Sequence, residues 1–163
     1  MTRFNQVSSK QDFKKIANMS DIIWRKHYIS IISLAQIEYM LDKYLSVDAI
    51  QDQLKGGFKY YFINYKGQNV GYVCIRKEED SLFLSKIYIF EEFRGKNIGR
   101  SAMLFVDEQA KDLNCQKVYL TVNRNNVNSI GVYEKLGFNN VGSLVMDIGN
   151  GFVMDDYKME KIV

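Results

Sequence analysis

The sequence contains no proline, one histidine (His27) and only two cysteines among its 163 residues. The cysteines, Cys74 and Cys115, have no CxxC spacing and no accompanying histidine cluster, so they support neither a disulfide framework nor a zinc site. We therefore predict no metal and two reduced thiols, as in a cytoplasmic protein. Since proline, internal repeats and low-complexity segments are all absent, nothing marks an interdomain linker, and we predict a single domain over residues 1–163.

Long apolar runs and one-sided charge are also absent. No segment approaches the ~20 consecutive apolar residues that a membrane-spanning helix needs, and the N-terminal residues lack the apolar stretch of a secretory signal. The 22 basic and 19 acidic residues are interspersed and leave a net charge of +3, without a clustered basic run. We expect a cytoplasmic protein that binds neither nucleic acid nor membranes. The mild positive balance suits a phosphorylated small ligand.

Residues 9–55 are predicted to be helical. Ser33 and Gln36 have the spacing of a capping box, with apolar residues at helical intervals behind them. Gly56 and Gly57 then end the last helix of this block.

Strand character begins at Phe58, where aromatic and β-branched residues take over. We predict three antiparallel strands before residue 90, a helix from Gly99 to Leu113, a strand parallel to the one ending at Ile89, a second helix closed by Gly137, and a final hairpin. These elements occupy, in order, residues 58–63, 70–75, 82–89, 99–113, 117–122, 127–136, 138–146 and 152–161. The fold class is therefore α/β (α+β), a mixed, mostly antiparallel sheet of about six or seven strands flanked by helices.

The segment Arg94-Gly95-Lys96-Asn97-Ile98-Gly99-Arg100 joins a strand end to a helix start. Such a turn directs unpaired backbone N–H groups to one point, where the helix dipole adds partial positive charge, so a pyrophosphate is a natural ligand. Taken alone, the same segment also fits an ordinary loop that caps a helix. A Walker A loop would need Gly-Lys-Ser/Thr, and a dinucleotide fold would need its glycines after the first strand of a βαβ series. Both alternatives are disfavoured.

With these features the sequence resembles the GNAT superfamily of N-acetyltransferases, whose signature at this junction is Arg/Gln-x-x-Gly-x-Gly/Ala. Arg94 and Gly99 match its first and last positions, whereas Asn97 stands at the middle glycine. Asparagine is the non-glycine residue that best tolerates a positive φ. A second resemblance, to Asn-x-x-Ala/Ser-Ile-x-x-Tyr-x-x-x-Gly-Phe, runs from residue 125 to Phe138. Two motifs in the right order and spacing are more specific than either alone.

The resemblance implies a GNAT-like fold, acetyl-CoA as cosubstrate and an amine acceptor. Carried over to this sequence, it implies that Tyr133 protonates the departing CoA thiolate and that a backbone N–H near Ile89 polarises the thioester carbonyl. The residues implied in cofactor binding are Ile87, Tyr88, Ile89, Arg94, Gly95, Lys96, Asn97, Ile98, Gly99, Arg100 and Asn126. Without the resemblance, Tyr133 would be read as part of a core stripe with Ile130 and Leu136.

The sequence assigns no general base. Phe83 and Thr121 occupy the positions where some family members carry an acid. Glu91 and Glu92 fit ordinary solvated loop charges, which leaves water relayed to bulk or to the C-terminal Asp155 or Asp156. His27 and Cys115 receive no catalytic role. The aromatic residues of the helical block fit either the core or the wall of an acceptor pocket; they are Trp24, Tyr28, Tyr39 and Tyr44.

A catalytically silent module that binds or senses acyl-CoA is the alternative function, and a nucleotide hydrolase is a distant third. The acceptor cannot be read from the sequence, because the acceptor site of this family is built from variable helices and loops. Polyamines, aminoglycosides, amino acids and protein N-termini stay open. The final hairpin, residues 138–161, is also able to pair between subunits, which would produce a homodimer.

Overall fold

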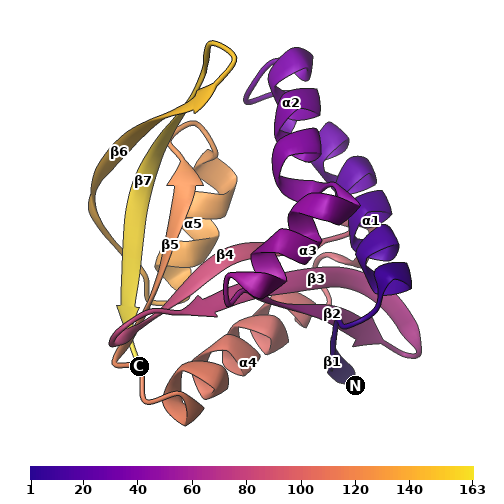
Figure 1. Cartoon of the computed structure of the whole chain (residues 1–163). Coiled ribbons are helices and arrows are strands. Elements are labelled where there is room, and N and C mark those ends of the chain that lie inside the picture. The colour runs from indigo at the N-terminus through magenta and orange to yellow at the C-terminus, as the bar shows by residue number, and fades with distance from the viewer.

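A computed structural model describes all 163 residues, which form one seven-stranded sheet and five α-helices (Figure 1). The elements run in the order β1 (Thr2–Gln6), α1 (Lys10–Tyr28), α2 (Leu34–Leu45), α3 (Val47–Lys55), β2 (Lys59–Tyr65), β3 (Gln68–Lys77), β4 (Ser81–Ile89), a 3-10 turn η1 (Glu91–Phe93), α4 (Ile98–Asp112), β5 (Lys117–Asn123), α5 (Val127–Lys135), β6 (Asn139–Gly149) and β7 (Phe152–Ile162).

The strands lie in the order β1-β2-β3-β4-β5-β7-β6, and only β4 and β5 are parallel. This confirms the predicted mixed, mostly antiparallel sheet and the predicted parallel pairing. Strand β1 was not predicted. It pairs with β2 at the edge of the sheet, and its residue Phe4 stacks on Phe105 of α4 with ring centroids 4.3 Å apart.

The predicted helical block consists of three helices, α1, α2 and α3. Ser9 and Asp12 form the reciprocal capping box at the start of α1, whereas Ser33 only accepts a hydrogen bond from the Gln36 N–H, at 3.1 Å. The predicted capping box at Ser33 is therefore wrong in its second half. The Gln36 side chain instead donates to the Val153 carbonyl, at 2.9 Å, and so ties α2 to β7.

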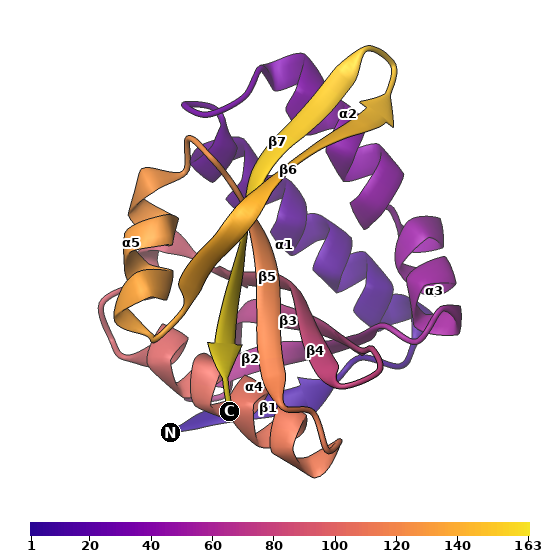
Figure 2. The same cartoon turned by 90° about the vertical axis from the view of Figure 1, so that its left-hand side faces the viewer.

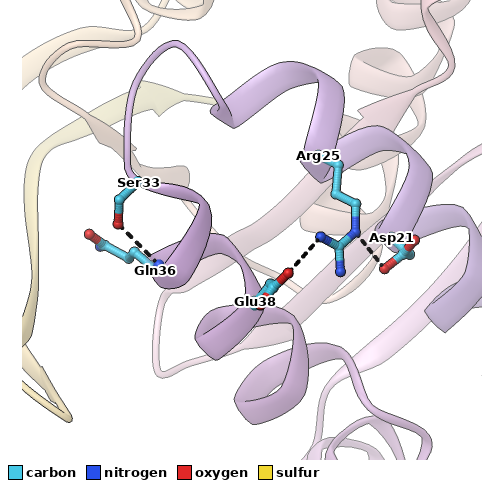
Figure 3. Close-up of polar contacts among 5 residues, drawn as sticks. All are labelled: Asp21, Arg25, Ser33, Gln36 and Glu38. Carbon is cyan, nitrogen blue, oxygen red and sulfur yellow. Dashed lines mark hydrogen bonds and ion pairs between the residues drawn. The ribbon is translucent and has the colours of Figure 1, made fainter.

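Helices α1 and α2 are joined by an exposed ionic bridge. Arg25 of α1 donates to Asp21 on its own helix, at 3.0 Å, and to Glu38 of α2, at 3.2 Å (Figure 3). Exposed pairs of this kind contribute little free energy.

Two hydrophobic cores lie on opposite faces of the sheet. Helix α4 packs on one face through Ile98, Met103 and Val106, and α1–α3 pack on the other through residues such as Ile16 and Ile37 (Figure 1). No helix is long and apolar enough to cross a membrane, and no group of histidine, cysteine and acidic residues is arranged to hold a metal ion.

The sheet divides where β4 and β5 part. The two strands pair only from Ser81 to Phe83 and from Lys117 to Tyr119, and beyond these residues β4 follows β3 while β5 follows β7. A bulge at Ser85, where the register of β3 against β4 shifts, adds a local bend. In Figure 1, β5–β7 accordingly stand upright beside the flatter layer of β2–β4, and Figure 2 shows the β6–β7 hairpin reaching toward α2.

Candidate active site

The space between the diverging strands is a cleft with a volume of about 1500 Å³. Its walls come from β4, β5, α5, the turn before α4, the helices α1 and α2, and the β6–β7 hairpin. The separation of β4 from β5 leaves the backbone edge of β4 beyond Phe83 without a partner strand on that side. A free strand edge presents N–H and C=O groups that an extended ligand is able to pair with.

The predicted pyrophosphate turn has an open helix N-terminus. Gly95 and Asn97 have φ angles of 79° and 62°, and Asn97 is the N-cap of α4 without a side-chain capping bond. The first bond of the helix runs from the Ser101 N–H to the Asn97 carbonyl, at 3.1 Å, so the preceding N–H groups of the first turn have no intrahelical partner. The left-handed conformation predicted to be tolerable for Asn97 is confirmed. Such an end binds anions.

Nearly all the residues implied in cofactor binding line this one cleft. They are Ile87, Tyr88, Ile89, Arg94, Gly95, Asn97, Ile98, Gly99, Arg100 and Asn126. Lys96 is the exception, because its exposed side chain is not part of the cleft wall. Ile87 and Ile89 pair with Val73 and Gly71 of β3 across the opposite edge of β4. The free edge of the strand therefore faces the cleft along these residues.

Asn126 is buried at the start of α5, and His27 of α1 is its side-chain partner. The amide Nδ2 of Asn126 lies 3.1 Å from Nε2 of His27. Burial, and then the charge of Arg94, lower the pKa of His27 and keep the ring neutral. A neutral Nε2 accepts the amide hydrogen and fixes the orientation of Asn126. Sequence reasoning gave His27 no role, because the contact joins residues that are far apart in the chain.

Tyr133 lies on α5 with its ring partly buried and lines the cleft. Its ring meets Phe138 edge-on, with centroids 5.8 Å apart, so the core-stripe interpretation is also met. Burial, and then proximity to Tyr28, raise the pKa of Tyr133 well above its ordinary value. The phenol therefore keeps its proton at neutral pH and remains available as a donor.

Two further tyrosines, Tyr28 and Tyr88, line the same cleft as Tyr133. The hydroxyls of Tyr28 in α1 and Tyr88 in β4 lie 2.9 Å apart. Burial raises the pKa of Tyr28 to about 12, with the Tyr88 hydrogen bond opposing this and the charge of Asp156 adding to it. These groups stay protonated and place two adjoining hydroxyls in the cleft wall.

Asp156 of β7 is the one carboxylate that lines the cleft, and it is only 4% exposed. It makes no ion pair, whereas its neighbour Asp155 is bound by Arg124 at 3.0 Å. Burial, and then the charge of Asp155, raise the pKa of Asp156 to about 6, while the Thr121 hydroxyl opposes the rise. A carboxylate with a pKa close to the working pH suits a general base. Sequence reasoning named Asp155 and Asp156 without choosing between them.

The aromatic residues of the helical block divide between core and cleft. Trp24 is 4% exposed and belongs to the α1–α3 core, although its ring also touches the cleft, while Tyr28 and Tyr44 line the cleft wall. Tyr39 lies outside the cleft and donates to the Ile148 carbonyl of β6, at 2.6 Å. Cys115 is buried in the α4 core, away from the cleft.

A family model, Acetyltransferase (GNAT) family, matches residues 17–138. The sequence is 26% identical over 96 residues to the spermine/spermidine N(1)-acetyltransferase of Bacillus subtilis (strain 168), covering 53% of this chain and 63% of that protein. It is 30% identical over 89 residues to the uncharacterized N-acetyltransferase YjgM of Escherichia coli (strain K12), covering 52% and 53%. The chain thus spans between half and two thirds of the length of these relatives.

Among solved structures, the fold is similar to that of the PaiA N-acetyltransferase from Thermoplasma acidophilum, which was solved in complex with coenzyme A. The TM-score is 0.81 with 19% sequence identity, over 100% of this chain and 99% of the other. The seven-stranded sheet and its helices therefore form a known fold. With a family model that covers most of the chain, this protein belongs to the GNAT family of acetyltransferases.

Proposed function

We propose that this protein transfers the acetyl group of acetyl-CoA to a primary amine by direct attack, with Tyr133 as general acid and Asp156 as general base. The observation that carries the proposal is a shared cleft. The open N-terminus of α4, the free edge of β4, Tyr133 and Asp156 all face the same space. An anion site and an acid–base pair on one cleft are the parts that acyl transfer from a pyrophosphate-bearing thioester needs.

Each of these groups acts in one step of the proposed acetyl transfer. Arg94, Arg100 and the first N–H groups of α4 bind the pyrophosphate, and Asn126 hydrogen-bonds the pantetheine arm. The carboxylate of Asp156 takes a proton from the acceptor ammonium, and the freed amine attacks the thioester carbonyl carbon.

The remaining steps take place along β4. A backbone N–H near Ile89 stabilises the oxyanion of the tetrahedral intermediate. When the C–S bond breaks, the Tyr133 hydroxyl donates its proton to the CoA thiolate, whose thiol has an ordinary pKa near ~8.5. The amine nitrogen gives up its second proton to solvent, and the Tyr133 phenolate takes a proton back from solvent. Because the amine attacks the thioester directly, no covalent enzyme intermediate forms.

The first test is calorimetric titration with acetyl-CoA. We expect micromolar binding by the intact protein and loss of binding in an Arg94→Ala/Gly99→Trp variant, because the first change removes a charge and the second fills the turn. A Cβ at Gly99 meets only the end of the Ile89 side chain, at 3.7 Å, and both residues line the cleft, so a tryptophan at this position is expected to fill part of the cleft next to the turn. Lys111→Gln, at the opposite and exposed end of α4, is the matched charge control and should bind normally.

Acetyl transfer is then followed by thiol release across a panel of amines. Binding without transfer to any amine would favour the alternative function, a silent acyl-CoA-binding module. No binding at all would overturn the proposal. A homodimer formed through the exposed edge strand β6 remains a prediction, and sedimentation of the protein tests it.

A further inference from the structure

Lys86 is a cleft-lining cation without an anionic partner. It follows the bulge in β4, and its side chain is partly buried in the wall of the cleft. Its Nζ donates to Ser85 Oγ, at 3.2 Å, and lies 5.6 Å from the centre of the Tyr60 ring. It makes no ion pair with any carboxylate.

This arrangement has an electrostatic cost, because burial disfavours the charged form of the lysine. Burial lowers the pKa of Lys86, and the only charge effect opposing it comes from Cys74. The pKa of that buried thiol is itself raised, so it stays neutral and supplies no counter-charge. A buried ammonium without an anion is expensive, and a ligand that brings the anion recovers the cost.

Lys86 is not placed to bind the cofactor phosphates. Its contacts Tyr60 and Cys74 belong to the core under α1–α3. The pyrophosphate turn leads into α4, which packs on the opposite face of the sheet. The group that Lys86 would bind therefore belongs to the other substrate, the acceptor.

The charges of the cleft also argue against a polyamine. Spermine and spermidine carry several ammonium groups, and each one that leaves water needs an anionic or polar partner. Asp156 is the only acidic residue in the cleft wall, against the cations Lys86, Arg94, Arg100, Lys135 and Lys158. The second lysine on the acceptor side, Lys158, already has Glu160 within 3.9 Å. The cleft therefore supplies a carboxylate for one ammonium group of the acceptor and none for the further ammonium groups of a polyamine.

We propose that Lys86 binds an anionic group of the acceptor, so that the acceptor is a primary amine that also carries a carboxylate or a phosphate. This rests on the proposed function, and it separates this chain from the relative whose name specifies spermine and spermidine. In the bound state Asp156 receives the ammonium and Lys86 the anion. The aromatic side chains of Tyr44, Phe58 and Phe83 in the cleft wall contact the part of the acceptor that joins its ammonium to its anionic group.

The test compares acceptors that differ only in the anion. Phenylalanine is paired with phenethylamine, tyrosine with tyramine, and O-phosphoethanolamine with ethanolamine, and spermidine represents the polyamines. The measurement is kcat/KM for acetyl transfer at saturating acetyl-CoA. We expect the anionic member of at least one pair to be preferred on the order of ten- to hundredfold, the size of a charge-assisted hydrogen bond. The first two pairs report a carboxylate site and the third a phosphate site.

Substitution of Lys86 should remove that preference selectively. Lys86→Gln and Lys86→Met should lower kcat/KM for the anionic acceptor on the order of ten- to hundredfold and leave the anion-free partner within about twofold. Lys86→Arg keeps the charge and should restore part of the preference. Lys158→Gln is the control, and the preference should survive it. Melting temperature and acetyl-CoA affinity are measured for each variant, so that a folding defect is recognised.

The outcomes separate the two proposals. Acetyl transfer that favours spermidine or the anion-free amines, or an equal loss for both members of a pair in Lys86→Gln, would overturn this inference and leave the acetyltransferase function standing. Failure to bind acetyl-CoA, or to acetylate any amine, would overturn both.

Discussion

Nε2 of His27, on α1, lies 3.1 Å from the Asn126 amide at the start of α5. The pair joins the helical block to the segment that resembles the second cofactor motif. Asn126 is 5% exposed, so the orientation of its amide depends on this partner. The contact thereby links the helical block to the start of α5.

Replacing His27 should weaken cofactor binding. In His27→Phe the Asn126 amide loses its acceptor, and we expect the Kd for acetyl-CoA to rise about tenfold, the cost of an unsatisfied buried donor. His27→Gln keeps an acceptor oxygen and should stay nearer the wild type. Because the pKa of His27 is lowered, the wild-type affinity should fall only well below pH ~6.5, and this fall should be absent in His27→Gln. Titration calorimetry at several pH values measures both effects, and equal affinities in all three proteins would contradict the assignment.

Tyr133→Phe should separate catalysis from packing. The ring and its contact with Phe138 remain, and only the hydroxyl is lost. We expect kcat to fall on the order of 10²-fold with the acetyl-CoA affinity and melting temperature unchanged. Steady-state kinetics with the best acceptor provides the measurement. Wild-type kcat in the variant would return Tyr133 to its structural role.

Asp156 should govern the acid limb of the pH profile. Its carboxylate is an effective base only when ionised, so kcat/KM should rise with pH through about 6 in the wild-type protein. In Asp156→Asn the rate should fall on the order of 10²-fold and this rise should disappear. The remaining increase at higher pH would reflect the acceptor amine itself. If the variant keeps the same profile, another group is the base.

The buried carboxylate of Asp156 should lower the free energy of unfolding at neutral pH. The folded-state pKa of Asp156 is raised from 3.8 to about 6, so the stability linked to its proton is fully present below about 4 and is lost as pH rises through about 6. At pH 7.5, Asp156→Asn should therefore stabilise the fold by about 1–2 kcal/mol, allowing for screening, and at pH 4 it should have little effect. Denaturant unfolding at the two pH values measures this. Asp155→Asn is the control, because that carboxylate is exposed and paired with Arg124, and it should change stability by less than about 1 kcal/mol.

Asn97 should be replaceable by glycine but not by valine. Its φ of 62° lies in the left-handed region, which glycine adopts freely and a β-branched residue resists by about 1–2 kcal/mol. Asn97→Gly should keep the acetyl-CoA affinity, whereas Asn97→Val should distort the first turn of α4 and weaken binding several-fold. Calorimetry on the two variants decides. A marked gain in affinity for Asn97→Gly would mean that asparagine handicaps the site.

Much of the fold was readable because its signals are local. Aromatic and β-branched runs marked β2–β4, Gly137 closed α5 with a φ of 98°, and the turn before α4 carried its own glycine and asparagine. Strand β1 was missed because it is a short edge strand with no fully buried residue, so it lacks the apolar alternation that marks a strand. The second half of the Ser33 capping box failed because the Gln36 side chain is directed to a distant strand, where its amide donates to the Val153 carbonyl instead of accepting from the Ser33 N–H.

By itself the sequence determined where the turn before α4 and the helix that carries Tyr133 lie, because each is a contiguous pattern whose geometry follows from local backbone preferences. The roles of these segments are predictions that rest on their resemblance to the family motifs. Only the tertiary structure shows that Asp156, and not Asp155, lines the cleft. Neighbouring residues of a strand point to opposite faces, so the position of β7 beside β5 turns Asp156 into the cleft and leaves Asp155 to Arg124. Likewise, only the packed structure shows that His27 contacts the Asn126 amide and that Lys86 lines the cleft without an acidic partner. Burial and pairing are properties of the assembled chain, and no local pattern encodes them.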